Sequence, residues 1–457
     1  MTAGRVLAVL DVGKTAARVV GIDAWGSVCF VTRHACRSFA NGAYPHLDVE
    51  STFNALCDGL AELSRTHVAD GIVSVAHGAA AAAIADDGLA MPVMDYEAVP
   101  PAEIFDDYER DAPEFPETFS PRLPAGLNLG RQMAWMEAVD PGDFSRAEAI
   151  LPFAQYWAWR FGGAPASEVS SLGCHTDLWN PTTGTFSSLA VRRGWSRKFA
   201  PIRAAGEALG KVDPGLARRL SLPEGIPVFC GLHDSNAAAW RCIGPAAGDD
   251  CVLSTGTWFV ALRPGGPLDT LDPALDMLAN VAPDGKPVPS IRFMGGREAE
   301  VIGDPALFAK VDEIAVNRVL ASGATALPCF ASAGGPFRGR IPELTAADGL
   351  GSADRAALSL LYVALVADWC LDRLGARGTL HVTGPFAGFS AFCGLLAALR
   401  RDTRVVADTE TDGTPLGAAL IARGRRGRGE GFRQVAPADL PAIGSARNRW
   451  REAAACR

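Results

Sequence analysis

Four residues near the start of the chain have the types of a phosphate-binding turn: Asp11, Gly13, Lys14 and Thr15. They lie between two apolar runs that predict a strand, a tight turn and a returning strand. The glycine lets backbone N–H groups approach a phosphate, and the lysine and threonine can donate to its oxygens. Asp11 can hold a magnesium ion through water. The alternative is an ordinary Asp-x-Gly turn.

The spacing excludes a P-loop at this place. A P-loop requires a glycine five residues before Gly13, with a flexible loop between the two. Position 8 is alanine, and a predicted strand fills the interval.

A second turn of small hydrogen-bond donors opens the second half of the chain, formed by Ser254, Thr255, Gly256 and Thr257. It also lies between two apolar runs, at 251–253 and 258–262. Two matching hairpins predict a duplicated domain, with the two turns facing each other across a cleft. Together they could grip a polyphosphate from both sides.

Two predicted strands end in residues that can contact a ligand. The strand at 226–230 leads through Gly231-Leu232-His233-Asp234 into an alanine-rich helix. Asp234 can be the N-cap of this helix, and its carboxylate would then still project into the same cleft. The strand at 72–75 leads to His77 and Gly78, and in open α/β sheets ligands bind at such strand ends.

The elements that must position these residues alternate between helix and strand. The predicted elements are helices at 51–64, 356–374, 390–399 and 414–422, and strands at 379–383 and 404–407. This alternation predicts an α/β fold with a largely parallel sheet. The proline-rich and acidic stretch 92–124 predicts an irregular excursion. Five arginines between Arg423 and Arg433 predict a solvated connector after the last helix, with a polyanion-binding arm as the alternative.

Length and composition limit the possible classes. A chain of 457 residues is long enough for two domains, which we place at 1–245 and 246–457. A net charge of -8 disfavours a nucleic-acid or anionic-membrane surface. Eleven scattered cysteines without a C-x-x-C pair predict reduced thiols and a cytoplasmic location. No apolar run is long enough to span a membrane.

Three motifs, in this order and spacing, resemble the FGGY carbohydrate kinases: Asp11-Val12-Gly13-Lys14-Thr15, the run 231–238 that begins Gly231-Leu232-His233-Asp234, and Leu253-Ser254-Thr255-Gly256-Thr257-Trp258. The similarity covers almost the whole chain and is nearest to the rhamnulokinase, fuculokinase and xylulokinase branches. It implies two ribonuclease-H-like domains of the actin and hexokinase type flanking a deep cleft. It also implies a phosphotransferase with an alcohol group as acceptor, which uses ATP and Mg²⁺. The sugar, a ketose or a polyol, would bind in the N-terminal domain and the nucleotide in the C-terminal one.

The resemblance also implies roles for single residues. Asp234 stands where the family keeps its catalytic base, which accepts the proton of the attacking sugar hydroxyl. His77 resembles the segment that meets the sugar in xylulokinase-like members, with a structural histidine as the alternative. Gln132, Trp135 and Asp177 are further sugar-site candidates, because amides and carboxylates bind hydroxyls and aromatic faces pack on sugars. Core packing and capping are the alternatives for Trp135 and Asp177.

One segment departs from the family pattern. Members usually have a glycine-rich turn after the strand at 379–383, but here only Gly384 and Gly388 remain small around Pro385-Phe386-Ala387. We therefore expect a narrowed or reshaped nucleotide pocket. The run 295–298 (Gly-Gly-Arg-Glu) is either a lid loop or a plain turn.

Two other functions stay open from the sequence. One is a non-catalytic sugar-binding or regulatory protein on the same scaffold, and the other is a nucleotide hydrolase or phosphotransferase with a non-sugar substrate. The sequence leaves the identity of the sugar open, and also the oligomeric state, a homodimer included.

Overall fold

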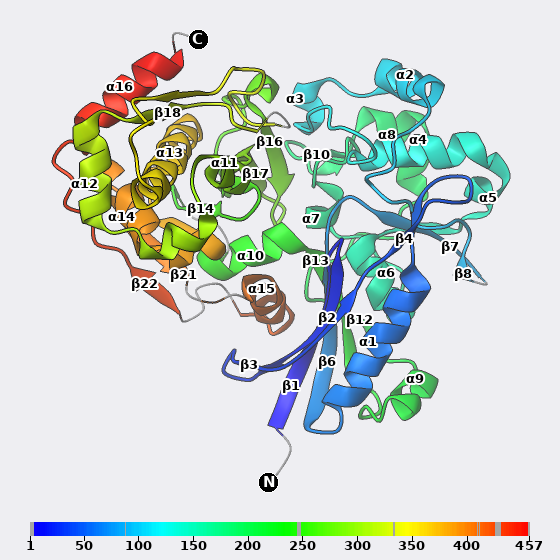
Figure 1. Cartoon of the computed structure of the whole chain (residues 1–457). Helices are drawn as coiled ribbons and strands as arrows, with labels where there is room; N and C mark the ends of the chain where they lie inside the picture. Colours follow the sequence, from blue (N-terminus) through cyan, green and yellow to red (C-terminus); the bar gives the residue numbers. More distant parts are fainter. Residues whose placement is uncertain are drawn as a thin grey trace. The chain divides into compact units, whose positions relative to one another are not determined.

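The computed structural model describes residues 4–86, 88–244, 248–331, 334–408, 410, 412–425 and 431–455 (Figure 1). The chain divides into two compact units. Unit 1 comprises Met1–Pro245, Ala279–Pro287 and Asp412–Gly429, and unit 2 comprises Ala246–Leu278, Val288–Thr411 and Glu430–Arg457.

Unit 1 is built on a six-stranded sheet with the strand order β12-β13-β6-β1-β2-β3. β1 pairs antiparallel with β2 and parallel with β6, and β13 pairs parallel with β6. The strands are β1 (Gly4–Val12), β2 (Ala16–Asp23), β3 (Val28–Ala35), β6 (His67–Ala76), β12 (Ala208–Lys211) and β13 (Pro227–His233). The predicted strand, turn and returning strand at the N-terminus are confirmed.

Helices cover both faces of this sheet, which explains the uninterrupted apolar sequence of β1. Val6, Ala8 and Leu10 pack in one core cluster, whereas Leu7 and Val9 pack in another on the opposite face. The first cluster includes residues of α1 and α6, and the second includes residues of α10 and α15. The helices are α1 (Val49–Leu63), α6 (Phe153–Arg160), α10 (Asp234–Ile243) and α15 (Gly413–Ala422). A strand buried on both faces needs apolar side chains at every position.

Two helices far apart in the sequence, α10 and α15, lie side by side in unit 1 (Figure 1). A Cβ atom added at Gly417 of α15 would lie 1.8 Å from the carbonyl oxygen of Ala237 in α10. The two backbones are therefore in direct contact, and only glycine allows this approach. The contact places Asp234, the first residue of α10, and Asp412, the N-cap of α15, on the same unit.

The rest of unit 1 holds short elements around a three-stranded sheet of order β8-β7-β9. The strands are β4 (Ser38–Phe39), β5 (His46–Leu47), β7 (Ala81–Ala85), β8 (Gly88–Leu89), β9 (Ala149–Pro152), β10 (Trp179–Asn180) and β11 (Thr185–Phe186). The helices are α2 (Ala102–Asp111), α3 (Phe115–Thr118), α4 (Leu129–Val139), α5 (Pro141–Arg146), α7 (Val169–Leu172), α8 (Ser188–Arg192) and α9 (Pro214–Arg219). The sequence predicts irregular structure at 92–124, and this prediction is wrong for the residues that form α2 and α3. Ile104 and Tyr108, four residues apart, give α2 an apolar side, and Tyr108 is fully buried.

Unit 2 is built on a mixed sheet in which β17, β15, β14, β20, β21 and β22 follow one another. The strands are β14 (Cys251–Ser254), β15 (Phe259–Leu262), β17 (Pro287–Phe293), β18 (Thr325–Leu327), β19 (Glu343–Thr345), β20 (Leu380–Thr383), β21 (Val405–Asp408) and β22 (Phe432–Gln434). β16 (Met277–Val281) begins in unit 2, and its residues from Ala279 onward belong to unit 1. The helices are α11 (Gly295–Ile302), α12 (Glu313–Ser322), α13 (Ser352–Arg373), α14 (Ser390–Leu399) and α16 (Ile443–Ala455). The helices and strands predicted from 356 to 422 are confirmed.

The prediction of a largely parallel sheet is wrong. In the part of unit 2 that the structure describes, β14, β20 and β21 pair in parallel, whereas β15 is antiparallel to β14 and β17, and β22 is antiparallel to β21. The reason is that each half opens with a hairpin, whose strands must be antiparallel.

The C-terminal region also differs from its prediction, because β22 and α16 follow α15. Arg423 does not belong to a solvated connector, since its guanidinium donates to the carbonyl oxygens of Ile22, at 2.9 Å, and Asp23. Arg426 and Arg428 lie outside the described residues. Among the helices that the structure describes, none combines the length and the apolar character needed to cross a bilayer.

Candidate active site

The first turn of unit 1 joins β1 to β2 and is closed by a hydrogen bond from the Gly13 N–H to the Ala16 oxygen, at 2.9 Å. The antiparallel register places Asp11 directly opposite Arg18. Nε and Nη2 of Arg18 donate to Oδ2 of Asp11 at 3.0 and 2.5 Å, and Nη1 donates to Oδ1 of Asp412 at 2.6 Å. One guanidinium therefore bridges carboxylates from two ends of the chain.

The charges around Asp11 favour an added cation. Burial raises the pKa of Asp11, Arg18 lowers it, and the nearby carboxylates of Asp234 and Asp412 raise it again. The net direction is upward, so the negative charge is incompletely neutralised. Both Arg18 contacts go to Oδ2, which leaves Oδ1 outside the ion pair.

These residues fit a magnesium ion that is held mainly by a substrate. Among the described residues, no three His, Cys, Asp or Glu side chains form a group that could enclose a metal. Mg²⁺ bound to nucleotides needs no such cage, because it takes one or two carboxylates together with phosphate oxygens and water. Asp11 can supply one such carboxylate.

Asp234 stands where β13 passes into α10. The backbone of His233 forms the N-cap, so Asp234 is the first helical residue, and its carboxylate accepts a hydrogen bond of 2.5 Å from the Ser235 N–H. Burial raises the pKa of Asp234 to about 6, while 33% of the side chain remains exposed. A carboxylate with these properties is ionised near neutral pH, and a hydroxyl can reach it.

His233 holds an N–H group beside this carboxylate. Nδ1 of the ring lies 2.9 Å from the amide nitrogen of Asn236, which is a donor, so Nδ1 is the acceptor and Nε2 carries the hydrogen. Nε2 lies 3.1 Å from Oδ1 of Asp234 and 3.2 Å from Sγ of Cys174. Burial lowers the pKa of His233 to about 4, so the ring is neutral near pH 7.

His77 follows β6, and its ring is buried among aromatic side chains. Its ring packs against Phe153 and Tyr96, with centroid distances of 4.9 and 5.2 Å. Both ring nitrogens are buried and have no hydrogen-bond partner among the described residues. Burial, followed by the charges of Lys14 and His233, lowers the pKa of His77 to about 3. A buried ring with two unused nitrogens can still bind a ligand, because one nitrogen can donate and the other can accept.

Gln132 and Trp135, both on α4, also carry unused polar atoms. Nε2 of Gln132 donates to the carbonyl oxygens of Ala79 and Gly126, at 2.8 and 2.6 Å. Its Oε1, and Nε1 of Trp135, are buried without a partner among the described residues. Ala79, to which Gln132 donates, is two positions after His77 in the sequence.

The sequence predicts that Lys14 binds a phosphate, but in the structure its side chain is paired with acidic residues. Its ammonium group is ion-paired with Asp95, lies 3.5 Å from Glu97, and stands 5.2 Å from the ring centroid of Tyr96. Although burial opposes it, the hydrogen bond from Lys14 holds the pKa of Asp95 below its ordinary value. To bind a phosphate, Lys14 would have to leave Asp95. Thr15, by contrast, is exposed in the turn.

Asp177 belongs to another network of unit 1. Its carboxylate accepts a hydrogen bond of 2.6 Å from Tyr108 and lies 3.6 Å from Arg122. Burial raises its pKa to about 7, and the charges acting most strongly on it are those of Arg122, Arg131 and Glu109. These are not the residues around Asp234.

The turn of unit 2 joins β14 to β15 and is fastened to the segment after β20. The N–H and the hydroxyl of Thr255 both donate to the Thr383 oxygen, at 2.9 and 2.5 Å, and the hydroxyl oxygen accepts from the Phe386 N–H at 3.1 Å. Thr255 is therefore occupied within the protein. Ser254 and Gly256 are half-buried and Thr257 is exposed, so these are the turn residues that a ligand can reach.

Gly384 is required by this arrangement. Its φ is 82°, and an added Cβ would lie 1.9 Å from the Thr255 oxygen. The Phe386 ring is 6% exposed and packs against Phe259 and Phe392 in the core. The ring therefore points inward and does not fill the space outside the turn. A Cβ at Gly388 would meet no atom within 4 Å.

Comparison with known proteins identifies the family. The profile of the FGGY carbohydrate kinase C-terminal domain matches residues 247–430. The crystal structure of a carbohydrate kinase from Novosphingobium aromaticivorans is 38% identical, with a TM-score of 0.90, over 100% of this chain and 99% of that one. The chain belongs to the FGGY family of carbohydrate kinases.

More distant relatives of this FGGY chain extend the comparison. An L-fuculokinase from Salmonella typhi is 26% identical over 275 residues, which is 58% of this chain and 58% of the fuculokinase. Xylulose kinase from Rhodospirillum rubrum has the same fold, with a TM-score of 0.78 at 17% identity over 99% of this chain and 98% of that one. The predicted family and the predicted fold class, two ribonuclease-H-like domains of the actin and hexokinase type, are confirmed.

Three charged or polar residues of this FGGY chain were missed from the sequence: Arg18, His233 and Asp412. The hairpin register could have found Arg18, because a turn centred between Lys14 and Thr15 pairs Asp11 with Arg18. His233 stood in the quoted motif, but nothing in the sequence gives its ring orientation. Asp412 lies 394 residues from Arg18, and no local pattern joins the two.

Proposed function

We propose that the protein is an ATP-dependent carbohydrate kinase that transfers the γ-phosphoryl group to a hydroxyl of a small sugar, either a ketose or a polyol. The observation that carries this proposal is Asp234, a partly exposed carboxylate with a raised pKa, 3.1 Å from His233. A Cβ added at Gly78, next to the unpartnered ring of His77, would lie 2.9 Å from the same His233 ring. A base of this kind and a set of unsatisfied hydroxyl-binding groups are what phosphorylation of a sugar alcohol needs.

Asp234 accepts the proton of the attacking hydroxyl and orients its oxygen toward the γ-phosphorus. His233, held by Asn236, keeps an N–H beside the same carboxylate and limits its rotation. His77, Gln132 and Trp135 bind the remaining hydroxyls and the apolar face of the sugar. Asp177 is held by Tyr108 of α2 and lies 3.6 Å from Arg122, and we give it a structural role.

Each unit contributes a turn whose residue types suit phosphate binding. Asp11 holds Mg²⁺ through water, with Gly13 and Thr15 beside it, and Arg18 keeps the carboxylate in place. Mg²⁺ held there would neutralise charge on the transferred phosphate. In unit 2, Ser254, Gly256 and Thr257 bind the phosphates, and Gly384 and Gly388 leave room for the nucleoside. Thr255 acts by fixing the turn.

A coupled assay of ADP release, run with ketoses, aldoses and polyols in parallel, tests the proposal. We expect turnover that depends on ATP, on Mg²⁺ and on one group of sugars. Turnover without any sugar would indicate a hydrolase, and tight sugar binding without turnover would indicate a regulatory protein. Either result would overturn the proposal.

A further inference from the structure

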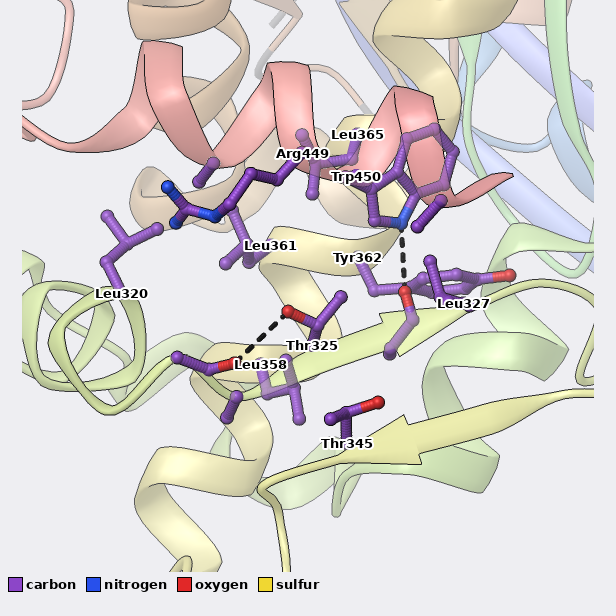
Figure 2. A pocket seen from close by; sticks show the side chains of 15 residues that line it. Leu320, Thr325, Leu327, Thr345, Leu358, Leu361, Tyr362, Leu365, Arg449 and Trp450 are labelled. Atoms are coloured by element: carbon purple, nitrogen blue, oxygen red, sulfur yellow. Dashed lines mark hydrogen bonds between the residues drawn. The ribbon is translucent and has the colours of Figure 1, made fainter. Parts of the chain in front are cut away.

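Unit 2 holds a pocket whose lining does not include its phosphate turn (Figure 2). The pocket has a volume of about 280 Å³ and lies where α12, α13, α16 and β18 meet. None of the turn residues 254–257 or 384–388 lines it. Its walls are mainly leucines of α12 and α13, with Trp450 of α16 opposite them.

Trp450 gives the pocket a rigid wall. Its indole is 2% exposed, and Nε1 donates to the Ala326 oxygen at 2.9 Å. The indole therefore presents carbon atoms to the pocket, because its polar atom is already used. An apolar ligand body is the matching partner for such a wall.

One charge lies at the pocket, and no described acidic residue neutralises it. Arg449 is the charged member of the described lining and takes part in none of the ion pairs found among the described residues. Its side chain is exposed and extends along the pocket toward Leu320 (Figure 2). The hydroxyls of Thr325 and Thr345 also lie in the lining, but they donate to the Gly323 oxygen at 3.3 Å and to the Glu343 carboxylate at 3.0 Å. The guanidinium of Arg449 is therefore the donor that a ligand carboxylate would meet.

We propose that this pocket binds a small amphipathic carboxylate, with the carboxylate at Arg449 and the apolar body between the α13 leucines and Trp450. The volume suits a chain of about eight to ten carbon atoms, since ligand pockets of roughly 300 Å³ enclose molecules of this size. A protein segment would not fit into so small a space.

The pocket is physically connected to the phosphate turn of unit 2. Tyr362, which lines it, donates its hydroxyl to the buried carboxylate of Glu298 on α11. Glu298 also accepts the Phe330 N–H at 3.2 Å. At the start of α11, a Cβ added at Gly296 would lie 2.2 Å from the Gly256 oxygen, so helix and turn are in backbone contact.

This connection gives the run 295–298 a role. A ligand that moves Tyr362 also moves the partner of a buried carboxylate, and α11 must follow or leave that charge unpaired. The displacement reaches Gly256 through the backbone contact. The pocket then changes nucleotide affinity, and this second step rests on the proposed function.

Octanoate is the probe for the binding site, with octanol as its uncharged counterpart. Isothermal titration should give one saturable site for octanoate and weaker binding of octanol. Arg449→Glu should weaken octanoate binding about tenfold, the value of one hydrogen-bonded charge pair. Asn448→Glu, the exposed neighbour outside the lining, is the matched control and should bind nearly as the wild type does. Ala446→Phe, which fills the pocket, should abolish binding.

Equal octanoate binding by wild type, Arg449→Glu and Ala446→Phe would overturn the site, as would no binding at all. The connection is tested by the Kd of ADP with and without saturating octanoate. We expect at least a threefold change in the wild type and none in Tyr362→Phe, which should still bind octanoate. An unchanged Kd in the wild type would refute the connection. Failure to bind ADP at all would count against the proposed function and would leave the octanoate result standing.

Discussion

The exchange Asp234→Asn tests the mechanism most directly. Asparagine has the shape of aspartate, and its amide oxygen can still accept the hydrogen bond from the Ser235 N–H. It cannot take a proton from a hydroxyl at neutral pH. The substitution therefore removes the base and leaves the turn between β13 and α10 intact.

The expected loss follows from the role of a positioned base. General-base catalysis contributes about 10²- to 10⁴-fold, which is roughly 3 to 5 kcal/mol of transition-state stabilisation. We expect kcat to fall by at least about 100-fold while the sugar KM stays within a few-fold. The reason is that Asp234 takes up the proton in the transition state and contributes little to binding the sugar in the ground state.

The pH profile gives an independent signature. The pKa of Asp234 is raised to about 6, and the active form is the ionised one. Activity of the wild type should therefore fall as the pH drops through about 6, approaching tenfold per pH unit below it. The residual activity of Asp234→Asn should lack this acidic limb.

The fall in kcat and the pH profile are both measured with the coupled ADP-release assay between pH 5 and 8. Circular dichroism confirms that the variant is folded. Asp58→Asn, an exposed carboxylate on α1, is the matched control and should leave kcat unchanged. Near-normal turnover in Asp234→Asn, or an unaltered acidic limb, would remove Asp234 from the reaction.

Four further results are expected. His77→Phe should raise the sugar KM about tenfold without lowering the melting temperature, because an unpartnered polar ring is exchanged for an apolar one; unchanged KM would place the sugar elsewhere. Arg18→Ala should lower the free energy of unfolding in urea by about 1 to 3 kcal/mol, since two carboxylates lose their shared partner and solvent screens part of the effect; a neutral result would contradict the ion-pair argument. Gly384→Ala should weaken ADP binding and cost roughly 2 kcal/mol of stability or more, because alanine must hold a positive φ and clash with Thr255; a variant with wild-type affinity would show that the turn is not used. Removal of divalent ions with EDTA should abolish turnover and Mg²⁺ should restore it, and activity that persists in EDTA would exclude the role given to Asp11.

The sequence predicts the hairpins of this fold well, because their information is local. Apolar runs interrupted by Asp11 to Thr15, and by Ser254 to Thr257, leave few alternatives to a strand, a turn and a strand. The alternating elements from 356 to 422 are equally local, and their bounds agree with the structure within a few residues. The order of strands in the sheet depends on long-range pairing, and there the predicted parallel sheet was wrong.

The partners of the site residues could not be predicted in the same way. Lys14 was placed on a phosphate from its position in a turn, yet its strongest neighbour, Asp95, is 81 residues away. For Asp11 the residue type suggests a metal, and its pairing with Arg18 follows only from the register of the hairpin. The ring of His233 is oriented by Asn236 on the next turn of helix, a detail that depends on side-chain rotamers.

The buried polar atoms without partners in unit 1 lower the stability of the free protein, and they would raise its affinity for the sugar in the proposed function. A buried donor or acceptor without a partner costs about 1 to 3 kcal/mol, and His77 has two such nitrogens and Gln132 one such oxygen. These groups are held in place by other contacts: the ring of His77 by Phe153 and Tyr96, and the amide of Gln132 by two carbonyl oxygens. These contacts fix the His77 ring and the Gln132 amide in place and leave their remaining polar atoms without a hydrogen bond. A sugar that supplies the missing hydroxyls recovers this free energy on binding, so ligand-induced stabilisation should be larger for the true substrate than for an epimer with one hydroxyl misplaced.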